Sequence, residues 1–294
     1  MAQVEREIDG QPERWQLAAE LATTPEAGRV LPRWGERVAV VGCGTSWFVA
    51  QCYAALREAA GHGETDAFAA SEFPTGRAYD RVLAISRSGT TTEVLDLLRG
   101  LPAGVPTGAL TGNGSSPVMS AAQRPMALPF ASESAIVQTR FATSVIALLR
   151  AHLGEDLTGV IADGACALTA ELPLDPAKVD QVTFLGTGWT AGLANEAALK
   201  CRETALVWSE SYPAMEYRHG PIAIAAPGRA VWVFGPVPAG LAQDIERTGA
   251  TLVSTELDPL ADLIRTQRFA LARAAHLGLD PDHPPNLTHS VVLP

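Results

Sequence analysis

The chain has 294 residues, of which 47% are hydrophobic and 18% are charged, and its formal net charge is −10. This composition supports a large core and excludes a disordered chain, and the negative charge argues against a nucleic-acid-binding protein, which needs a basic face. The sequence contains no run of 18 apolar residues and no apolar leader, so we expect a cytoplasmic protein without a membrane partner. The four cysteines lack the spacing of metal ligands, and we expect neither a metal nor a cofactor.

The first predicted strand, residues 38–41, leads into a Gly-x-Gly turn at Gly42 and Gly44 and then into a helix over residues 48–58. The same arrangement recurs at residues 182–203, which indicates an internal duplication. Glycine at such turns permits close approach of the backbone to a ligand or to the next helix. Neither copy completes the Gly-x-Gly-x-x-Gly pattern with an acidic partner, so a dinucleotide site is the less favoured alternative.

The most informative segment is residues 85–93, which follows a buried strand over residues 81–84 and precedes a helix over residues 94–98. Five of the seven residues from Ser86 to Thr92 carry a hydroxyl group. Hydroxyls and a glycine at a strand-to-helix turn present free backbone N–H groups and the positive end of the helix dipole to an anion. The alternative is an ordinary helix cap, but a cap requires only one hydroxyl. The segment therefore favours a phosphate site.

Strands and helices continue to alternate along the chain. We predict strands at 107–111, 125–129, 230–234 and 251–254, helices at 138–153 and 239–248, and a linker within 154–180. This alternation predicts parallel sheets covered on both faces, with ligands at the carboxyl ends of the strands. We predict an α/β protein with two doubly wound, flavodoxin-like α/β/α sandwiches: an N-terminal helical segment (1–27), a first domain (28–160) and a second domain (172–294).

The second half carries the acid–base candidates. Glu196, Lys200 and Glu203 are spaced to lie on one face of a helix. An exposed stripe of ion pairs is the alternative, but the surrounding Ala, Leu and Cys residues favour a polar face on a largely buried helix. His219 precedes Gly220-Pro221, which ends a helix and places the imidazole in a loop. Its residue chemistry leaves a structural and a functional role equally open.

These motifs together resemble the sugar isomerase (SIS) family of phosphosugar-binding domains. The hydroxyl-rich segment and the turn at residues 42–46 carry the first part of the resemblance. The segments 194–203 and 216–221 extend it to the isomerase domain of glucosamine-6-phosphate synthase and to short amino-sugar-phosphate deaminase/isomerases and deglycases. The resemblance covers nearly the whole chain.

The resemblance implies roles for individual residues. Glu203 matches the general base, Lys200 the lysine beside it, and His219 a histidine that assists ring opening and often reaches the partner subunit's site. The phosphate ligands that it implies are Thr45, Ser46, Ser86, Arg87, Ser88 and Thr91. The residues that it implies beside the sugar are Gly44, Glu133, Ile136 and His289.

Two departures from the family pattern limit the expected chemistry. His289 stands where the synthase carries a Schiff-base lysine, and an imidazole cannot form that imine. No nucleophilic cysteine stands near the start, so we do not expect a glutamine-dependent synthase.

The expected function is aldose–ketose isomerisation of a hexose or amino-hexose 6-phosphate through an enediol, in amino sugar metabolism, by a homodimer with a shared active site. A partly desolvated carboxylate suits the proton transfer, and a neighbouring lysine can stabilise the enediolate. Deamination and deglycation stay open as variants. The alternative is a non-catalytic sugar-phosphate sensor, but a pure binder does not need both Glu203 and His219.

Overall fold

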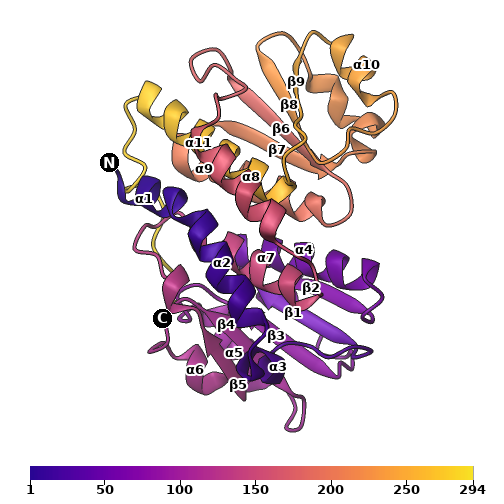
Figure 1. Cartoon of the computed structure of the whole chain (residues 1–294), viewed down its shortest axis with the longest axis vertical. Helices are drawn as coiled ribbons and strands as arrows, with labels where there is room; N and C mark the ends of the chain where they lie inside the picture. The colour runs from indigo at the N-terminus through magenta and orange to yellow at the C-terminus, as the bar shows by residue number, and fades with distance from the viewer. Residues whose placement is uncertain (294) are drawn as a thin grey trace. The chain divides into compact units, whose positions relative to one another are not determined.

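The computed structural model describes residues 1–293 and divides into two compact units (Figure 1). The five-stranded unit comprises residues 10–157 and the chain end from residue 288. The four-stranded unit comprises residues 1–9 and 158–287. The predicted α/β class with two parallel sheets is confirmed.

The five-stranded unit has strand order β2-β1-β3-β4-β5, with all neighbouring strands parallel. Its strands are β1 (Val38–Gly42), β2 (Thr65–Ala69), β3 (Arg81–Ile85), β4 (Thr107–Thr111) and β5 (Arg124–Ala127). Its helices are α2 (Gln11–Ala22), α3 (Pro25–Val30), α4 (Thr45–Ala59), α5 (Thr92–Gly100), α6 (Val118–Ala121) and α7 (Arg140–His152), with short 3-10 turns at Ala70–Glu72 and Pro129–Ala131.

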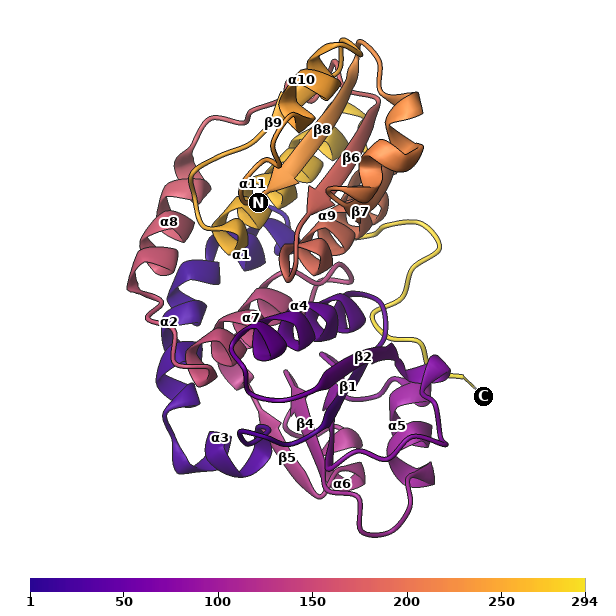
Figure 2. The ribbon, with the colours of Figure 1, turned by 90° about the vertical axis from the view of Figure 1, so that its right-hand side faces the viewer.

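Both faces of this sheet are covered, which explains why β1 and β3 are buried along their whole length. Ala39, Val41, Val82 and Ala84 point to one face and pack against α5 and α6. The opposite face is covered by α4, which contacts α7 (Figure 2). Alternate strand residues thus serve two separate helix layers.

The four-stranded unit has strand order β7-β6-β8-β9, and its neighbouring strands are also parallel. Its strands are β6 (Gln181–Gly186), β7 (Trp208–Pro213), β8 (Arg229–Phe234) and β9 (Thr251–Val253). Its helices are α1 (Gln3–Asp9), α8 (Thr158–Thr169), α9 (Thr190–Ala205), α10 (Leu241–Glu246) and α11 (Pro259–His276), with 3-10 turns at Glu216–His219 and Pro221–Ile224. Leu185, Val231 and Val233 pack against α10, whereas α9 contacts both the sheet and α11.

Several features differ from the sequence-based expectations. The predicted linker contains α8, which packs against α11 and so joins the four-stranded unit. The chain from residue 288 joins the five-stranded unit, although the predicted second domain ran to residue 294, which lies outside the described residues. The strands β2 and β7 and the helix α11 were not predicted. The strand β7 lies at the sheet edge and carries Ser, Glu and Tyr, so it lacks an apolar run.

The two Gly-x-Gly turns have the same local geometry. A Cβ atom on Gly42 would lie 2.6 Å from the Ser46 carbonyl carbon, and one on Gly186 would lie 2.1 Å from the Thr190 carbonyl oxygen. The second glycines, Gly44 and Gly188, have φ angles of +54° and +59°. Each turn therefore needs glycine twice, first for close approach of the helix and then for a left-handed backbone.

We predict that Gly186→Ala lowers the free energy of unfolding by at least about 2 kcal/mol, because the methyl group overlaps the backbone of the first turn of α9. The matched control is Gly159→Ala in α8, where a Cβ would have no neighbour within 4 Å. That change should stabilise the protein by roughly 0.5–1 kcal/mol through helix propensity. Urea unfolding at constant m-value measures both effects, and equal stabilities of the two variants would contradict the close-approach argument.

Candidate active site

The hydroxyl-rich segment Ser86–Thr91, called here the Ser/Thr loop, lies at the edge of the five-stranded sheet that is formed by the carboxyl ends of its strands. It connects β3 to α5, while the turn at Gly42–Gly44 connects the neighbouring strand β1 to α4. Because α4 and α5 cover opposite faces (Figure 2), the ends of β1 and β3 flank a topological switch point. Open α/β sheets bind ligands at such points.

Hydroxyl groups organise the Ser/Thr loop itself. The Gly89 N–H donates to Ser86 Oγ at 3.1 Å, and the Thr90 N–H donates to Ser88 Oγ at 3.2 Å. Ser86 Oγ and Thr91 Oγ1 are 3.4 Å apart. Within the described residues, Thr91 makes no side-chain capping bond at the start of α5, so ordinary capping does not account for the hydroxyls. The loop is a preformed polar turn at a helix N-terminus.

The turn after β1 contributes a second set of polar groups at this sheet edge. Thr45 and Ser46 begin α4 and are buried, whereas Gly44 is exposed. Since β1 and β3 are parallel neighbours, their carboxyl ends lie at one edge of the sheet. The structure thus brings the predicted phosphate ligands of both segments to one edge. Their contact with phosphate stays a prediction.

The Arg87 side chain has a different set of partners. Its Nη1 donates to the carbonyl oxygens of Ala135 at 2.7 Å and Ile136 at 3.3 Å, and its Nη2 donates to the His289 carbonyl at 2.5 Å. The side chain is buried, so these bonds are shielded from water. Arg87 thereby links two segments that the sequence predicts beside the sugar. Its own role in phosphate binding stays a prediction.

Glu133 stabilises the segment that precedes α7. Its Oε1 accepts hydrogen bonds from the Thr139 N–H at 2.7 Å and the Arg140 N–H at 2.6 Å, at the start of α7. His289 Nε2 lies 3.3 Å from the Glu133 carbonyl oxygen. The structure therefore gathers Glu133, Ile136 and His289 around Arg87, and the carboxylate of Glu133 caps a helix.

Sequence reasoning missed Ser290, which follows the predicted His289. Ser290 Oγ lies within hydrogen-bonding distance of Ser88 Oγ, at 3.1 Å, and of Thr90 Oγ1, at 2.9 Å. The only available signal was its place next to His289, since no local pattern pairs it with a loop about 200 residues earlier.

The predicted acid–base residues share one face of α9. Lys200 Nζ lies 2.5 Å from Glu203 Oε2 and 3.4 Å from Glu196 Oε1. The side chains of Lys200 and Glu196 are 1% and 2% exposed, whereas that of Glu203 is 19% exposed. The alternative of a solvated stripe is therefore wrong. A buried ammonium held between two carboxylates needs both of them to offset its desolvation.

The surroundings of Lys200 limit which groups can react. Burial raises the pKa of the adjacent Cys201 thiol to about 12, so this thiol stays protonated at neutral pH.

Glu203 stands 13 positions after Thr190, about 20 Å along the helix. The face of α9, rather than the Gly186-Thr-Gly188 turn, therefore positions Glu203.

His219 ends a short 3-10 turn on the surface of the four-stranded unit. Its neighbour Arg218 anchors this turn: Arg218 Nε lies 2.7 Å from Asp244 Oδ2, and Nη2 donates to the Ala239 carbonyl at 2.8 Å. Gly220 follows with a φ angle of +136°. The imidazole is thus presented outward from a fixed loop.

The switch point of the four-stranded sheet is closed by a hydrogen bond. Thr190 Oγ1 donates to the Phe234 carbonyl at 3.1 Å, which joins the start of α9 to the end of β8. The segment after β8, residues 235–240, contains no hydroxyl residue. The first four strands of both units follow the same order, but within residues 1–293 the Ser/Thr loop belongs to the five-stranded unit alone.

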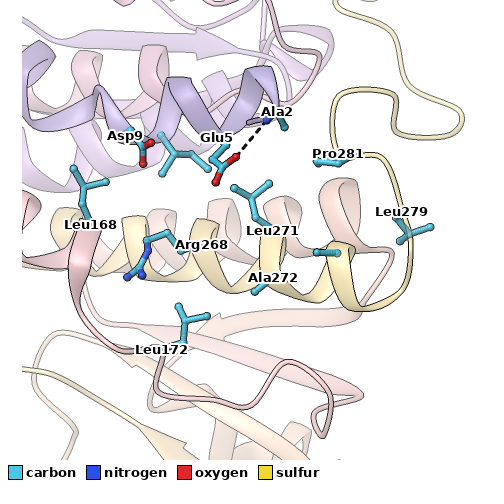
Figure 3. A pocket seen from close by; sticks show the side chains of 12 residues that line it. Ala2, Glu5, Asp9, Leu168, Leu172, Arg268, Leu271, Ala272, Leu279 and Pro281 are labelled. Atoms are coloured by element: carbon cyan, nitrogen blue, oxygen red, sulfur yellow. Dashed lines mark hydrogen bonds between the residues drawn. The ribbon is translucent and has the colours of Figure 1, made fainter.

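A cavity of about 550 Å³ lies among α1, α8 and α11 of the four-stranded unit (Figure 3). Its polar lining includes Glu5, Asp9 and Arg268. Burial raises the pKa of Asp9, and the nearby Glu5 carboxylate raises it further. Arg268 donates to the carbonyl oxygens of Ala167 and Ala170 and so caps the end of α8. None of the predicted site residues lines this cavity.

The described residues contain no group of three or more His, Cys, Asp or Glu side chains arranged to hold a metal ion. Among residues 1–293, no helix combines the length and the hydropathy that a membrane-spanning helix requires.

Comparison with known proteins identifies relatives, although no family model matches the sequence. The glutamine–fructose-6-phosphate aminotransferase (isomerizing) of Tropheryma whipplei is 26% identical over 88% of this chain and 52% of that protein. The chain spans about half the length of the curated relatives that it matches.

Solved structures extend the comparison to the whole fold. Glucosamine-6-phosphate deaminase from Thermotoga maritima is 26% identical, with a TM-score of 0.83 over 98% of this chain and 99% of that chain. The C-terminal domain of glucosamine-fructose-6-phosphate aminotransferase from Francisella tularensis shares the fold at 19% identity, with a TM-score of 0.82 over 96% and 98% of the two chains. These relatives confirm the resemblance that the sequence motifs carry.

Removal of the Lys200 charge should destabilise the protein strongly. We predict that Lys200→Met lowers the free energy of unfolding by about 3 kcal/mol or more at pH 7, because two carboxylates lose their shared buried cation. Denaturant unfolding at pH 7 measures this.

The only other lysine in the sequence provides the matched control. Lys178 pairs with Asp175 at 3.1 Å, but its side chain is 82% exposed. Lys178→Met should change stability by less than about 0.5 kcal/mol. A Lys200→Met variant as stable as Lys178→Met would contradict the structural role given to the buried ion pairs.

Proposed function

We propose that this chain, a relative of the sugar isomerase family, is a phosphosugar isomerase that moves a proton between C1 and C2 of a hexose or amino-hexose 6-phosphate. The observation that carries the proposal is the pair Lys200–Glu203: a partly exposed carboxylate held at 2.5 Å by a fully buried ammonium. The named enzymes among its relatives support catalysis over the alternative of a non-catalytic sensor.

Glu203 acts as the general base in this proposal. Lys200 binds its Oε2 and fixes the carboxylate in place, so that Oε1 takes the carbon-bound proton and returns it to the neighbouring carbon. The ammonium also offsets negative charge that develops on the enediolate. With an amino sugar, the same proton transfer yields a ketimine, which water hydrolyses to the ketose phosphate and ammonia. The deaminase among the structural relatives supports this second outcome.

The Ser/Thr loop binds the phosphate group. Ser86, Ser88 and Thr91 supply hydroxyl donors at the N-terminus of α5, and Thr45 and Ser46 supply donors from the neighbouring turn. Anions are stabilised there because the first N–H groups of a helix lack intrahelical partners. Gly44, Glu133, Ile136 and His289 stand beside the sugar in this proposal.

The proposal includes two sugar isomerase domains, one for each sheet, in a cytoplasmic homodimer. His219 is exposed on an anchored loop, which suits a histidine that completes the site of a partner subunit. Light scattering of the purified chain gives its oligomeric state.

The direct test of the function is a panel of hexose and hexosamine 6-phosphates. Proton NMR in D₂O follows exchange of the proton on C1 or C2 and identifies the product, and a coupled assay follows ammonia. Solvent deuterium should enter the product at the exchanged carbon. A chain that converts no member of the panel, with its fold intact, would contradict the proposed activity.

Loss of a loop hydroxyl should weaken phosphate binding generally. Ser88→Ala should raise the Kd of every 6-phosphate ligand by roughly 10- to 100-fold, because a hydrogen bond to a charged group is lost. Ser115→Ala, at an exposed turn after β4, should leave the Kd unchanged. Calorimetric titration measures both variants, and equal affinities would remove the Ser/Thr loop from the site.

Glu203→Gln should reduce turnover on the order of 100- to 10,000-fold while substrate binding is retained, since the amide keeps the volume but cannot take up a proton. Glu196→Gln is the control on the same helix face, and it should do less harm. Isotope exchange in D₂O separates the proton transfer from later steps. Near-normal exchange by Glu203→Gln would assign the base to another residue, with His219 and His289 the next candidates.

A further inference from the structure

The chain end from His289 to Leu293, called here the tail, is attached to the five-stranded unit by polar contacts. Val291, Val292 and Leu293 are 53%, 65% and 53% exposed, so apolar burial contributes little to its position. The Arg87 guanidinium donates to the His289 carbonyl at 2.5 Å and is itself buried. Hydrogen bonds with a charged donor are the stronger kind, and burial shields this one from water. Arg87 is therefore a principal anchor of the tail.

The tail uses hydroxyl donors of the Ser/Thr loop. Ser88 Oγ and Thr90 Oγ1 lie 3.1 and 2.9 Å from Ser290 Oγ and 3.0 Å from each other, so the three hydroxyl groups form one hydrogen-bonded cluster. A hydroxyl group has one hydrogen to donate, so a hydroxyl whose hydrogen is used within this cluster does not simultaneously donate to a phosphate oxygen.

The tail also uses the backbone at the start of α5. The Thr92 N–H donates to the Val291 carbonyl at 3.3 Å, and the Leu293 N–H donates to Thr92 Oγ1 at 2.8 Å. Thr92 is the first residue of α5, whose N–H has no partner within the helix. Figure 2 shows the end of the chain beside α5. The tail thus takes up donors of the kind that an anion at this helix terminus would use.

We propose that Arg87 is a positioning residue that holds the tail on the Ser/Thr loop, where Ser290 competes with phosphate for the Ser88 and Thr90 hydroxyls. The competition rests on the proposed phosphate site, whereas the anchoring does not. A ligand phosphate must displace Ser290, and the anchor at Arg87 determines how readily the tail leaves.

The guanidinium suits this task better than other side chains. Its planar, forked group reaches the carbonyls of Ala135 and Ile136 on one side and of His289 on the other. A lysine ammonium presents its donors from a single atom, so it cannot span both segments with the same geometry. Arg87→Lys should therefore behave like Arg87→Ala rather than like the wild type.

Amide hydrogen exchange of residues 289–293 in the full chain tests the anchor. Arg87→Ala and Arg87→Lys should speed this exchange by about tenfold or more, since the protecting contacts open locally. Arg99→Ala is the control, because Arg99 lies on α5 in an exposed pair with Asp96. Unchanged exchange in both Arg87 variants would overturn the anchor.

Titration with inorganic phosphate tests the competition. Ser290→Ala and Arg87→Ala should each tighten phosphate binding by about fivefold, the worth of one net hydrogen bond. The increase in phosphate affinity of the double variant should be smaller than the product of the two single increases, because both changes act through the tail. Ser290→Ala keeps the inference testable if Arg87→Ala does not fold.

The outcomes separate this inference from the proposed function. Weaker or unchanged phosphate binding in both variants, with wild-type binding intact, overturns the competition alone. Failure of every variant, wild type included, to bind phosphate overturns the competition together with the proposed phosphate site. Faster tail exchange in the Arg87 variants supports the anchor in either case.

Discussion

The close approach of a helix to a strand at two glycines is the constraint on which both sheets depend. At Gly42 and Gly186 the backbone of the following helix occupies the space that a side chain would fill. This contact brings the start of α4 against β1 and the start of α9 against β6, each an inner strand of its sheet. Each of these strands lies beside a switch point of its sheet, so one steric requirement, met twice, fixes where a helix starts at the edge where ligands bind.

The duplicated frame carries different chemistry in its two copies. In the five-stranded unit the switch point is flanked by hydroxyls and by the N-termini of α4 and α5. In the four-stranded unit Thr190 joins the two strand connections, and the ionisable residues lie instead along the face of α9. The two turns are therefore alike because both serve the fold. In the proposed reaction the five-stranded unit binds the phosphate, and the ionisable residues of α9 in the four-stranded unit transfer the proton.

The sequence was most informative where a local pattern determines structure. Apolar runs identified β1, β3 and β8, because strands buried on both faces are predominantly apolar. Helical spacing placed Glu196, Lys200 and Glu203 together, and the structure adds that the face is buried. Edge strand β7 escaped prediction because its polar residues carry no such pattern.

The remaining features depend on contacts between distant parts of the chain. The partners of Arg87 and Ser290 lie about 50 to 200 positions away, and no local spacing encodes them. The sequence suggested Arg87 as a phosphate ligand, which stays a prediction, and gave no sign that its guanidinium binds the carbonyl oxygens of Ala135, Ile136 and His289. The direction of the Arg87 and Ser290 side chains depends on which distant segments the fold brings near them, and this is known only from the tertiary structure.

The scarcity of lysine gives the molecule a built-in chemical probe. Lys178 and Lys200 are the only side-chain amines in the sequence. The Lys178 side chain is 82% exposed, whereas that of Lys200 is 1% exposed. An acylating reagent should therefore modify Lys178 at the rate of a free amine and Lys200 only when the surroundings of α9 open. The ratio of the two rates, read by mass spectrometry, would report the opening free energy of the helix that bears the acid–base residues, without any engineered label.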